Sequence, residues 1–539
     1  MLQLMSAVAS SPSLPLSPSR PAVNPWIIAL TVSLATFMEV MDTSIANVAL
    51  VHIAGNMAAS RSESTWVLTS YLVSNAIVLP ISGWLSSVMG RKRFYMTCVA
   101  LFTISSFLCG LAPSLGWLLF FRVLQGAGGG GLAPSEQAIL TDTFPPRLHG
   151  QAFAFYGVAV VVAPAIGPAL GGWITDNYSW RWIFFINIPV GILSLFLTAV
   201  LVTDSENAKK EHAHVWKDGL KVDYIGFGLI ALGLACLQVV LDKGQEDDWF
   251  GSNFIRIFAL LATIGLIVGI IWELFVTPHP MVDLPLFKNR GFLFTNLVMF
   301  AMFFILLSTT QLLPQLAQEG LGYNATKAGL VLMPGGFTIM ALMPIVGRLV
   351  NIVQPRYLIA FGLFMVGVSM EYFSHFDLEI SFKTLAMARM LQAGSVAFLF
   401  IPINTVAYSG LPPGKRNNAS ALINLMRNLG WSVGVSAAIT VVDRRTQFHH
   451  ARLAESVNIY SPAYQQFIHR MGGSSLDMAA NSASSPSTVL GHISQMLQGQ
   501  ATMLAYLDVF KIMAIGSFLM IILALFFKKT TPGEVAHGH

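Results

Sequence analysis

Long apolar runs alternate with short polar segments along almost the whole chain. Taking each run of about 20 apolar residues as a membrane-spanning helix, we predict fourteen spans. Their approximate limits are 26–48, 65–87, 94–112, 116–138, 150–174, 182–202, 223–242, 254–276, 292–314, 326–349, 356–373, 382–408, 418–441 and 505–527. Runs of this length are typical of helices and exceed the strands of a membrane barrel. The pattern predicts an all-α polytopic protein surrounded by a lipid bilayer.

Composition supports this assignment. Of the 539 residues, 54% are hydrophobic and 11% are charged, whereas a soluble domain usually carries about 25% charged residues. The net charge of +5 is spread along the chain, so we do not predict binding to nucleic acid. Neither a nucleotide-binding loop nor a zinc-protease or nucleophile-elbow motif is present. We therefore expect neither an enzyme nor a cofactor or metal, and an ion gradient must drive any uphill transport.

Basic residues gather in alternate loops, including 91–93, 209–221 and 415–416. Because loops rich in Lys and Arg stay in the cytoplasm, we expect both termini to be cytoplasmic and the protein to lie in the inner (plasma) membrane. Residues 1–25 read as a disordered cytoplasmic tail, and residues 528–539 as a second tail. The outer face carries one long loop, 442–504, which favours contact with a partner protein.

An internal repeat divides the chain into two halves. Residues 79–85 (LPISGWL) resemble 343–349 (MPIVGRL) at an offset of 264, and 121–126 (FRVLQG) resemble 388–393 (ARMLQA) at an offset of 267. Two matches at nearly one offset predict duplicated six-helix bundles, 26–202 and 292–527. Residues 203–291 form a linker with two extra spans. Repeats that flank a central site are typical of secondary transporters.

The fourth predicted span combines charge, glycine and proline. Residues 120–140 read FFRVLQGAGGGGLAPSEQAIL and contain Arg122 and Glu136. Ionisable groups at membrane depth are costly and usually face a cavity or a partner. The glycines allow close helix packing, and Pro134 permits a bend. We expect one helix that borders a solute pathway; the alternative is a structural helix with a snorkelling arginine.

Two carboxylates near the end of the first predicted span are candidate proton carriers. Glu39 and Asp42 are three residues apart and share a helix face. Burial in a low dielectric can raise the proton affinity of such groups. The alternative is an acid that caps or borders the span, which we weigh most for Glu39. The residues predicted to line a cavity are Asn47, Gln125, Asn424, Arg427 and Asn428.

Several motifs carry a family resemblance. They are MDTSIANVAL (41–50), GWLSSVMGRKRFY (83–95), FFRVLQGAGGGGLAP (120–134), GVAVVVAPAIGPALGGWI (157–174), SWRWIFFINIPVG (179–191) and VDLPLFKNRGF (282–292). In this order they resemble the EmrB-like (EmrB/QacA) fourteen-span drug:proton antiporters of the major facilitator superfamily. The resemblance covers about residues 26–527.

The resemblance implies roles for particular residues. Asp42 would couple protons to substrate, and Arg122 would belong to the proton relay. The antiporter motif, which would pack the two halves tightly, comprises Gly157, Pro164, Gly167, Pro168, Gly171 and Gly172. The cytoplasmic gate loop would contain Gly83, Gly90, Arg91 and Lys92. Ser87 stands where the family often has an acid, so we expect the usual charge network of the gate to be lost and the basic residues 91–93 to serve mainly in orienting the chain.

The function expected from the resemblance is proton-coupled multidrug efflux, with a role in antibiotic resistance. The substrates would be hydrophobic or amphipathic compounds, and the proton gradient would supply the energy. The chain would be the permease of a tripartite pump, joined to a periplasmic adaptor and an outer-membrane channel. Two alternatives stay open. One is a dedicated exporter of a single metabolite, such as a siderophore, lipid or amino acid; the other is a receptor-like membrane protein without flux.

Overall fold

A computed structural model describes residues 23–217, 222–278, 280–408, 415–457 and 486–525, with the single residues 411 and 466. The first half contains α1 (Pro25–Asn56), α2 (Arg61–Met89), α3 (Arg91–Leu111), α4 (Leu115–Gly129), α5 (Leu132–Thr143), α6 (His149–Asn177), α7 (Trp182–Phe185) and α8 (Asn187–Leu201). Three helices follow: α9 (Glu206–Lys217), α10 (Tyr224–Lys243) and α11 (Asn253–Ile271). The second half contains α12 (Arg290–Gln315), α13 (Ala325–Leu330), α14 (Met333–Leu349), α15 (Pro355–Phe373), α16 (Phe382–Tyr408), α17 (Arg416–Ser456) and α19 (Pro486–Leu525).

The described residues contain thirteen helices that are long and apolar enough to cross a membrane. Each matches a predicted span, and the remaining prediction, 116–138, is divided between α4 and α5. The expectation of one continuous helix is therefore wrong. Glycine is a poor helix former, and α4 ends in the glycine run at Gly129. The run also permits close packing, because a β-carbon on Gly128 would lie 2.7 Å from the backbone nitrogen of Phe102 in α3.

Local sequence signals explain where helices begin. The side chain of Asn24 accepts a hydrogen bond from the backbone N–H of Trp26 (3.0 Å), and Pro25 occupies the first position of α1. Ser60 and Glu63 form a reciprocal capping box at the start of α2. Large apolar side chains remain exposed on the outside of the bundle, as on α11 at Ile257, Leu260, Ile264 and Ile267. Such a surface fits lipid.

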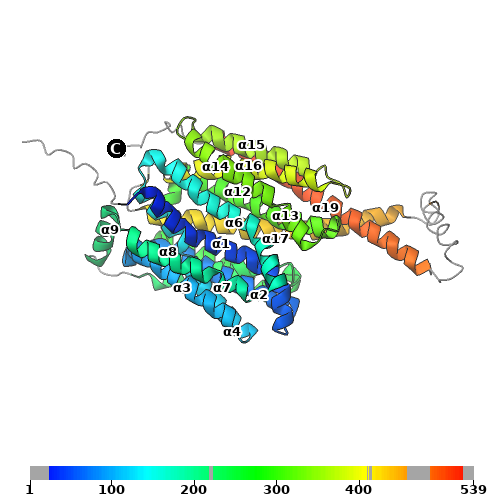
Figure 1. Cartoon of the computed structure of the whole chain (residues 1–539), viewed down its shortest axis with the longest axis horizontal. Helices are drawn as coiled ribbons and strands as arrows, with labels where there is room; N and C mark the ends of the chain where they lie inside the picture. Colours follow the sequence, from blue (N-terminus) through cyan, green and yellow to red (C-terminus); the bar gives the residue numbers. More distant parts are fainter. Residues whose placement is uncertain are drawn as a thin grey trace, which may run out of the picture.

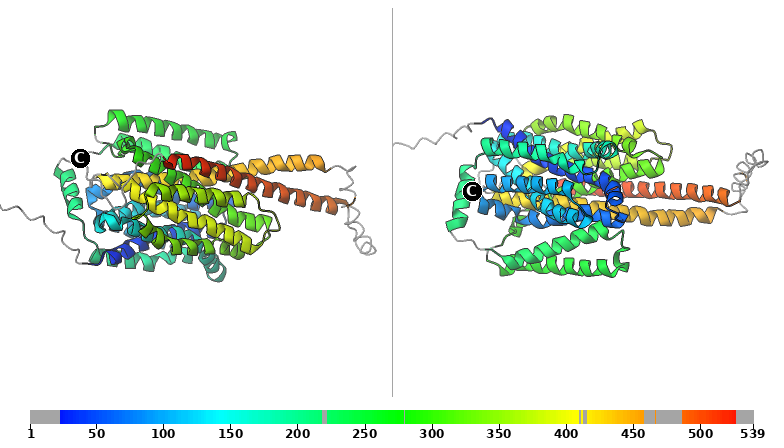
Figure 2. Two further views of the ribbon diagram at one scale, coloured as in Figure 1. Left: turned by 90° about the horizontal axis from the view of Figure 1, so that it is seen from above. Right: turned by 60° about the horizontal axis from the view of Figure 1, so that its bottom comes forward.

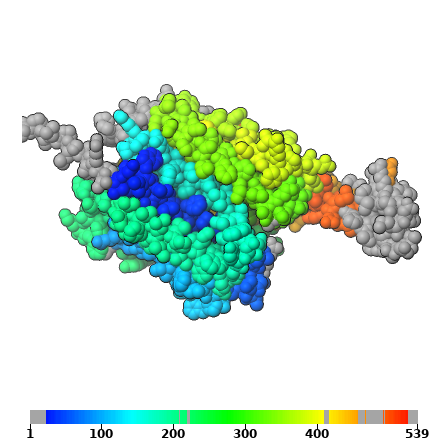
Figure 3. Space-filling view, in the orientation of Figure 1, coloured from blue at the N-terminus to red at the C-terminus, as the bar shows by residue number. Residues whose placement is uncertain are grey.

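Figures 1 and 3 show two helical halves lying side by side, blue to cyan for the first and green to yellow for the second. They meet where α6 packs against α14 and α2 packs against α17. The extra pair, α10 and α11, lies on the outside of the bundle, and α10 contacts both α2 and α17 (Figure 2). Helix α9 lies across one end of the bundle, which we call the α9 end.

At the opposite end, α17 and α19 extend beyond the other helices (Figure 1); we call this the projecting end. Helix α17 has 41 residues, or about 60 Å at 1.5 Å per residue, twice the thickness of a hydrocarbon core. The predicted loop 442–504 must be corrected, because residues 442–456 and 486–504 are helical. Their polar composition hid this extension from a search for apolar runs. The rest of that loop, and the tails 1–22 and 526–539, lie outside the described residues.

Candidate functional site

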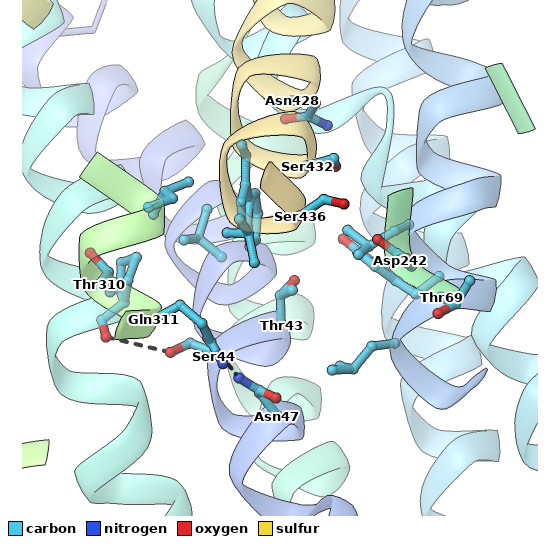
Figure 4. Close-up of a pocket in the computed structure, with 18 of the residues that line it drawn as sticks. Thr43, Ser44, Asn47, Thr69, Asp242, Thr310, Gln311, Asn428, Ser432 and Ser436 are labelled. Carbon is cyan, nitrogen blue, oxygen red and sulfur yellow. Dashed lines mark hydrogen bonds between the residues drawn. The ribbon is translucent and has the colours of Figure 1, made fainter. Parts of the chain in front are cut away.

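A cavity of about 470 Å³ lies between the two halves. Its walls come from α1, α2, α6, α10, α12, α16 and α17. Figure 4 shows polar lining residues from five of these helices: α1, α2, α10, α12 and α17. Along α1 it runs from Glu39 to Val51, about 18 Å at the rise of a helix. Val51 is 70% exposed at the projecting end. The cavity thus extends from the middle of the bundle to the surface of that end.

Glu39 is the acid at the inner limit of the cavity on α1. Its side chain is 8% exposed, and Oε1 accepts hydrogen bonds from Tyr71 Oη (3.2 Å) and Asn75 Nδ2 (3.3 Å). Its Oε2 is buried without a hydrogen-bond partner. Among the described residues, no cation forms an ion pair with Glu39. A carboxylate in this setting can take up or release a proton without breaking an ion pair.

Asp42 lies one turn further along α1 in a different environment. Arg122 Nη1 donates to its Oδ2 at 2.6 Å, and Gln125 Nε2 and Asn187 Nδ2 donate to its Oδ1 at 3.0 and 2.6 Å. The Arg122 and Asp42 side chains are 0% and 1% exposed. The guanidinium also lies 4.5 Å from the ring centroid of Tyr71. The prediction that Gln125 lines the cavity is wrong, because Gln125 and Asp42 form a buried network within the first half instead.

Glu136 is brought into the first half by α5. It is fully buried, and Ser33 Oγ of α1 donates to its Oε1 at 2.5 Å. The residue does not line the cavity. Glu136 lies towards the α9 end, apart from Glu39, which lines the cavity and is bonded to α2 instead.

The second half contributes two arginines to the cavity wall. Arg427 donates to Tyr156 Oη at 2.7 Å, and Asn428 donates to Asn75 at 3.0 Å, so α17 is bonded to both α6 and α2. Arg389 also lines the cavity and donates to Thr310 Oγ1 at 2.7 Å. Arg389 lies in the second copy of the internal repeat, 388–393, and the sequence alone does not predict that it lines the cavity.

Of the two remaining residues predicted to line the cavity, Asn47 does so and Asn424 does not. Asn47 lines the cavity and donates to Gln311 at 3.3 Å, a link between α1 and α12. Asn424 must be corrected: it is fully buried and donates instead to Gln137 Oε1 at 2.8 Å. The same oxygen accepts hydrogen bonds from Tyr408 (2.8 Å) and Ser420 (2.9 Å). Gln137 thus joins the first half to two helices of the second and closes the bundle below the cavity.

A charge network closes the α9 end. Arg91 is 3% exposed and donates to Asp142 of α5 and, at 3.3 Å, to Glu211 of α9. Glu211 Oε1 accepts hydrogen bonds from Ser87 at 2.6 Å and from Asn417 of α17 at 3.4 Å. The expectation that Arg91 mainly orients the chain is wrong, because it is buried in this network. The acid absent at position 87 is supplied from α9 by Glu211.

The remaining gate-loop residues shape the same end. Gly90 has φ +84° between α2 and α3, a conformation that favours glycine. A β-carbon on Gly83 would lie 2.5 Å from Asn418 Oδ1, so the absence of a side chain lets α2 approach α17. The backbone N–H of Lys92 donates to Asp204 at 2.8 Å, and its Nζ donates to the carbonyl of Ala199 at 2.7 Å. Lys92 thereby connects α3 to the end of α8.

The antiporter-motif glycines lie on α6 but contact different partners. A β-carbon on Gly157 would be 2.8 Å from both Met343 and Phe400 of the second half. Those on Gly167 and Gly171 would meet α1 instead, 2.5 Å from Ser44 Oγ and 3.0 Å from Ile45 Cγ2. A β-carbon on Gly172 would meet nothing within 4 Å. Both prolines, Pro164 and Pro168, lie inside α6, and the Pro164 carbonyl accepts a hydrogen bond from Ser44.

Two helical bundles that enclose a central cavity with mixed polar and apolar walls, closed at one end, form the architecture of a membrane transporter. The sequence profile of the Major Facilitator Superfamily matches residues 32–435. Multidrug export protein EmrB of Haemophilus influenzae is 38% identical over 508 residues, covering 94% of this chain and 96% of the relative. The same-named protein of Escherichia coli K12 is 38% identical over 513 residues, covering 95% and 97%. The chain belongs to the Major Facilitator Superfamily, as an EmrB-like drug transporter.

Other likenesses agree with this fold. Fatty acid resistance protein FarB of Neisseria gonorrhoeae is 38% identical over 444 residues, covering 82% of this chain and 86% of the relative. The solved structure of the human organic anion transporter MFSD10 has a TM-score of 0.60 at 12% identity, covering 93% of this chain and 100% of that chain. A structure of the proton:xylose symporter XylE has a TM-score of 0.59 at 13% identity, covering 95% and 97%. These two structures support the fold alone.

Proposed function

We propose that this protein exports hydrophobic or amphipathic compounds in exchange for protons. The observation that carries the proposal is the cavity between the halves, which ends at the buried carboxylate Glu39 and extends to the projecting end. The EmrB proteins similar to this chain are named for multidrug export. A broad cavity with mixed apolar and polar walls fits compounds of varied shape.

In this proposal the α9 end is cytoplasmic and both termini lie on that side, in the inner membrane. The described conformation is then closed to the cytoplasm by Gln137 and the Arg91–Asp142–Glu211 network. Transport requires a second state in which these bonds break and the projecting end closes. Coupling needs only that substrate and proton bind the two states with different affinities.

Glu39 carries the proton in this mechanism, because it faces the cavity and forms no ion pair with any residue that the structure describes. Asp42 and Arg122 supply a fixed charge pair beside it, linked through Tyr71, which contacts both Arg122 and Glu39. A substrate that enters from the cytoplasm in the second state displaces the proton from Glu39 towards the α9 end. A proton that enters from the projecting end in the described state competes with the substrate and favours its release. Glu136, nearer the α9 end, is the second carboxylate available for the route to the cytoplasm.

The projecting parts of α17 and α19 suit a role in a tripartite pump, with a periplasmic adaptor and an outer-membrane channel. Helices that extend about 30 Å beyond a hydrocarbon core present their surface to other proteins rather than to lipid. Co-purification of a membrane adaptor with the full chain, lost when residues 446–500 are replaced by a short linker, tests this assignment. Retained co-purification would place the adaptor contact elsewhere.

A dedicated exporter of one metabolite class is the second candidate. Arg389 and Arg427 give the cavity wall two cations that suit a carboxylate, and the similar FarB protein is named for fatty acid resistance. Susceptibility profiles of a deletion strain distinguish the two functions. Sensitisation to several unrelated drugs and dyes supports multidrug export, whereas sensitisation to fatty acids alone supports the second function. No sensitisation, together with no flux in proteoliposomes, would refute both.

A further inference from the structure

Helix α10 places a carboxylate in the cavity wall from outside the two repeats. Asp242 lines the cavity together with Thr69 of α2 and Ser432 and Ser436 of α17 (Figure 4). Gln238 Nε2 donates to Asp242 Oδ1 at 2.9 Å, while Oδ2 is buried without a hydrogen-bond partner. A buried polar atom left unpaired is costly. The free oxygen therefore has an acceptor site to offer a ligand.

The nearest lysine along the chain, Lys243, forms its ion pair with Glu246 and not with Asp242. Lys243 Nζ donates to Ser62 O (2.8 Å), to Thr65 Oγ1 and to Glu246 (2.7 Å), all at the projecting rim. Among the described residues, no Lys or Arg forms an ion pair with Asp242. Asp242 is thus left without a direct ion-pair partner in this part of the wall.

Arg427 lies deeper in the cavity than Asp242, and Arg389 is bonded to Thr310 of α12, on the opposite side of the cavity from Asp242 (Figure 4). Gln238 pairs with Ser432 (3.0 Å) and Gln245 pairs with Asp443 (2.7 Å), so α10 and α17 run alongside each other in register. Asp242, four residues after Gln238, is then level with about Ser436. Arg427 lies nine residues earlier on α17, which is about 14 Å nearer the α9 end. At that separation a solvated cavity screens the arginine strongly.

Apolar and aromatic side chains surround this carboxylate. The cavity wall near it includes Leu68, Leu72, Leu241, Trp431, Val435 and Ile439. Such a wall accommodates the apolar part of a ligand. The indole of Trp431 is the type of aromatic ring that attracts cations most strongly. The unpaired Oδ2 atom of Asp242 lies within this apolar wall. The site therefore suits an apolar ligand that carries one positive charge.

We propose that Asp242, with Thr69, Ser432 and Ser436, is a recognition site for the charged group of amphipathic organic cations. The inference rests on the proposed function, because it takes this cavity as the transport route. It assigns a specific task to the extra helix pair: α10 supplies the acid that the two repeats do not place at this level. Cations and neutral compounds then share one cavity but differ in their dependence on α10.

Equilibrium dialysis of the purified full chain in detergent tests the proposal, with ethidium as the cation and N-phenyl-1-naphthylamine as the neutral dye. Asp242→Asn keeps the shape of the side chain and removes its charge. We expect the Kd for ethidium to rise at least tenfold, about 1.4 kcal/mol, while the Kd for the neutral dye stays within twofold. Asp247→Asn, the same change at an exposed position five residues away, serves as the control and leaves both values unchanged.

The outcomes separate this inference from the proposed function. Wild type that binds both dyes, with unchanged ethidium affinity in Asp242→Asn, refutes the role of Asp242 alone. Equal losses for both dyes in the variant also refute it, because they indicate damage to the cavity rather than loss of a charge contact. Wild type that binds neither dye, and moves neither in proteoliposomes, refutes export of such compounds and the inference with it.

Discussion

Removal of its charge is predicted to destabilise the protein strongly at Asp42 and only weakly at Glu39, the two acids of α1. Asp42→Asn leaves Arg122 fully buried with no counter-charge, although Arg122 keeps its bonds to Val67 O (3.0 Å) and Gln125 (2.8 Å). Breaking one partner of a buried pair costs about 3–5 kcal/mol. Glu39→Gln leaves no cation unpaired and keeps an acceptor for Tyr71 and Asn75, so its cost should stay within about 1 kcal/mol.

The apparent Tm of each purified variant measures this difference. It is obtained by heating samples and using size-exclusion chromatography to determine how much folded protein remains. We expect Asp42→Asn to lower the apparent Tm by about 5 °C and Glu39→Gln to leave it nearly unchanged. The double variant Asp42→Asn/Arg122→Gln should recover most of the loss, because the uncompensated charge is gone. Equal Tm values for the two single variants, or no recovery in the double variant, would refute the assignment of Asp42 to a fixed charge pair.

Three further predictions concern the gate, the glycine stripe and pH. Glu211→Gln weakens the closure of the α9 end by about 1.5–3 kcal/mol, so a cysteine placed at Ser420 should react faster with a cytoplasmic thiol reagent; an unchanged rate would exclude Glu211 from the closure. Gly167→Leu should reduce transport and Gly172→Leu should not, since only the first meets α1 at short range; equal effects in a dye-efflux assay would contradict this. Because protonation of Glu39 competes with substrate, the Kd of a substrate with a constant charge should rise as the pH falls, and Glu39→Gln should flatten that dependence; an unchanged slope in titrations would contradict the competition.

The membrane helices were predictable from sequence because each one needs a long apolar run, whatever its neighbours. The break between α4 and α5 was harder to predict, since glycine is tolerated inside many membrane helices and its effect depends on the packing of Gly128 against α3. The projecting part of α17 was missed because a helix outside the bilayer has no apolar run to identify it.

The site was predicted only in part, because its chemistry depends on contacts between distant residues. Glu39 and Asp42 look alike in sequence, and only the position of Arg122, eighty residues away, separates the paired acid from the unpaired one. Glu211 and Asp242 were not predicted as site residues, because both lie in the segment 203–291, which is interpreted from sequence as a linker with two extra spans. The acid missing at Ser87 was the one signal that a carboxylate from elsewhere had to complete the gate.

Proton release on substrate binding tests the central claim most directly. A weakly buffered detergent solution of the purified wild-type protein, monitored with a pH-sensitive dye, should acidify when ethidium is added. Glu39→Gln should bind ethidium but release no proton. Acidification that is equal in wild type and Glu39→Gln would remove Glu39 from its role, and wild-type protein that binds substrate without any pH change would contradict drug:proton antiport itself.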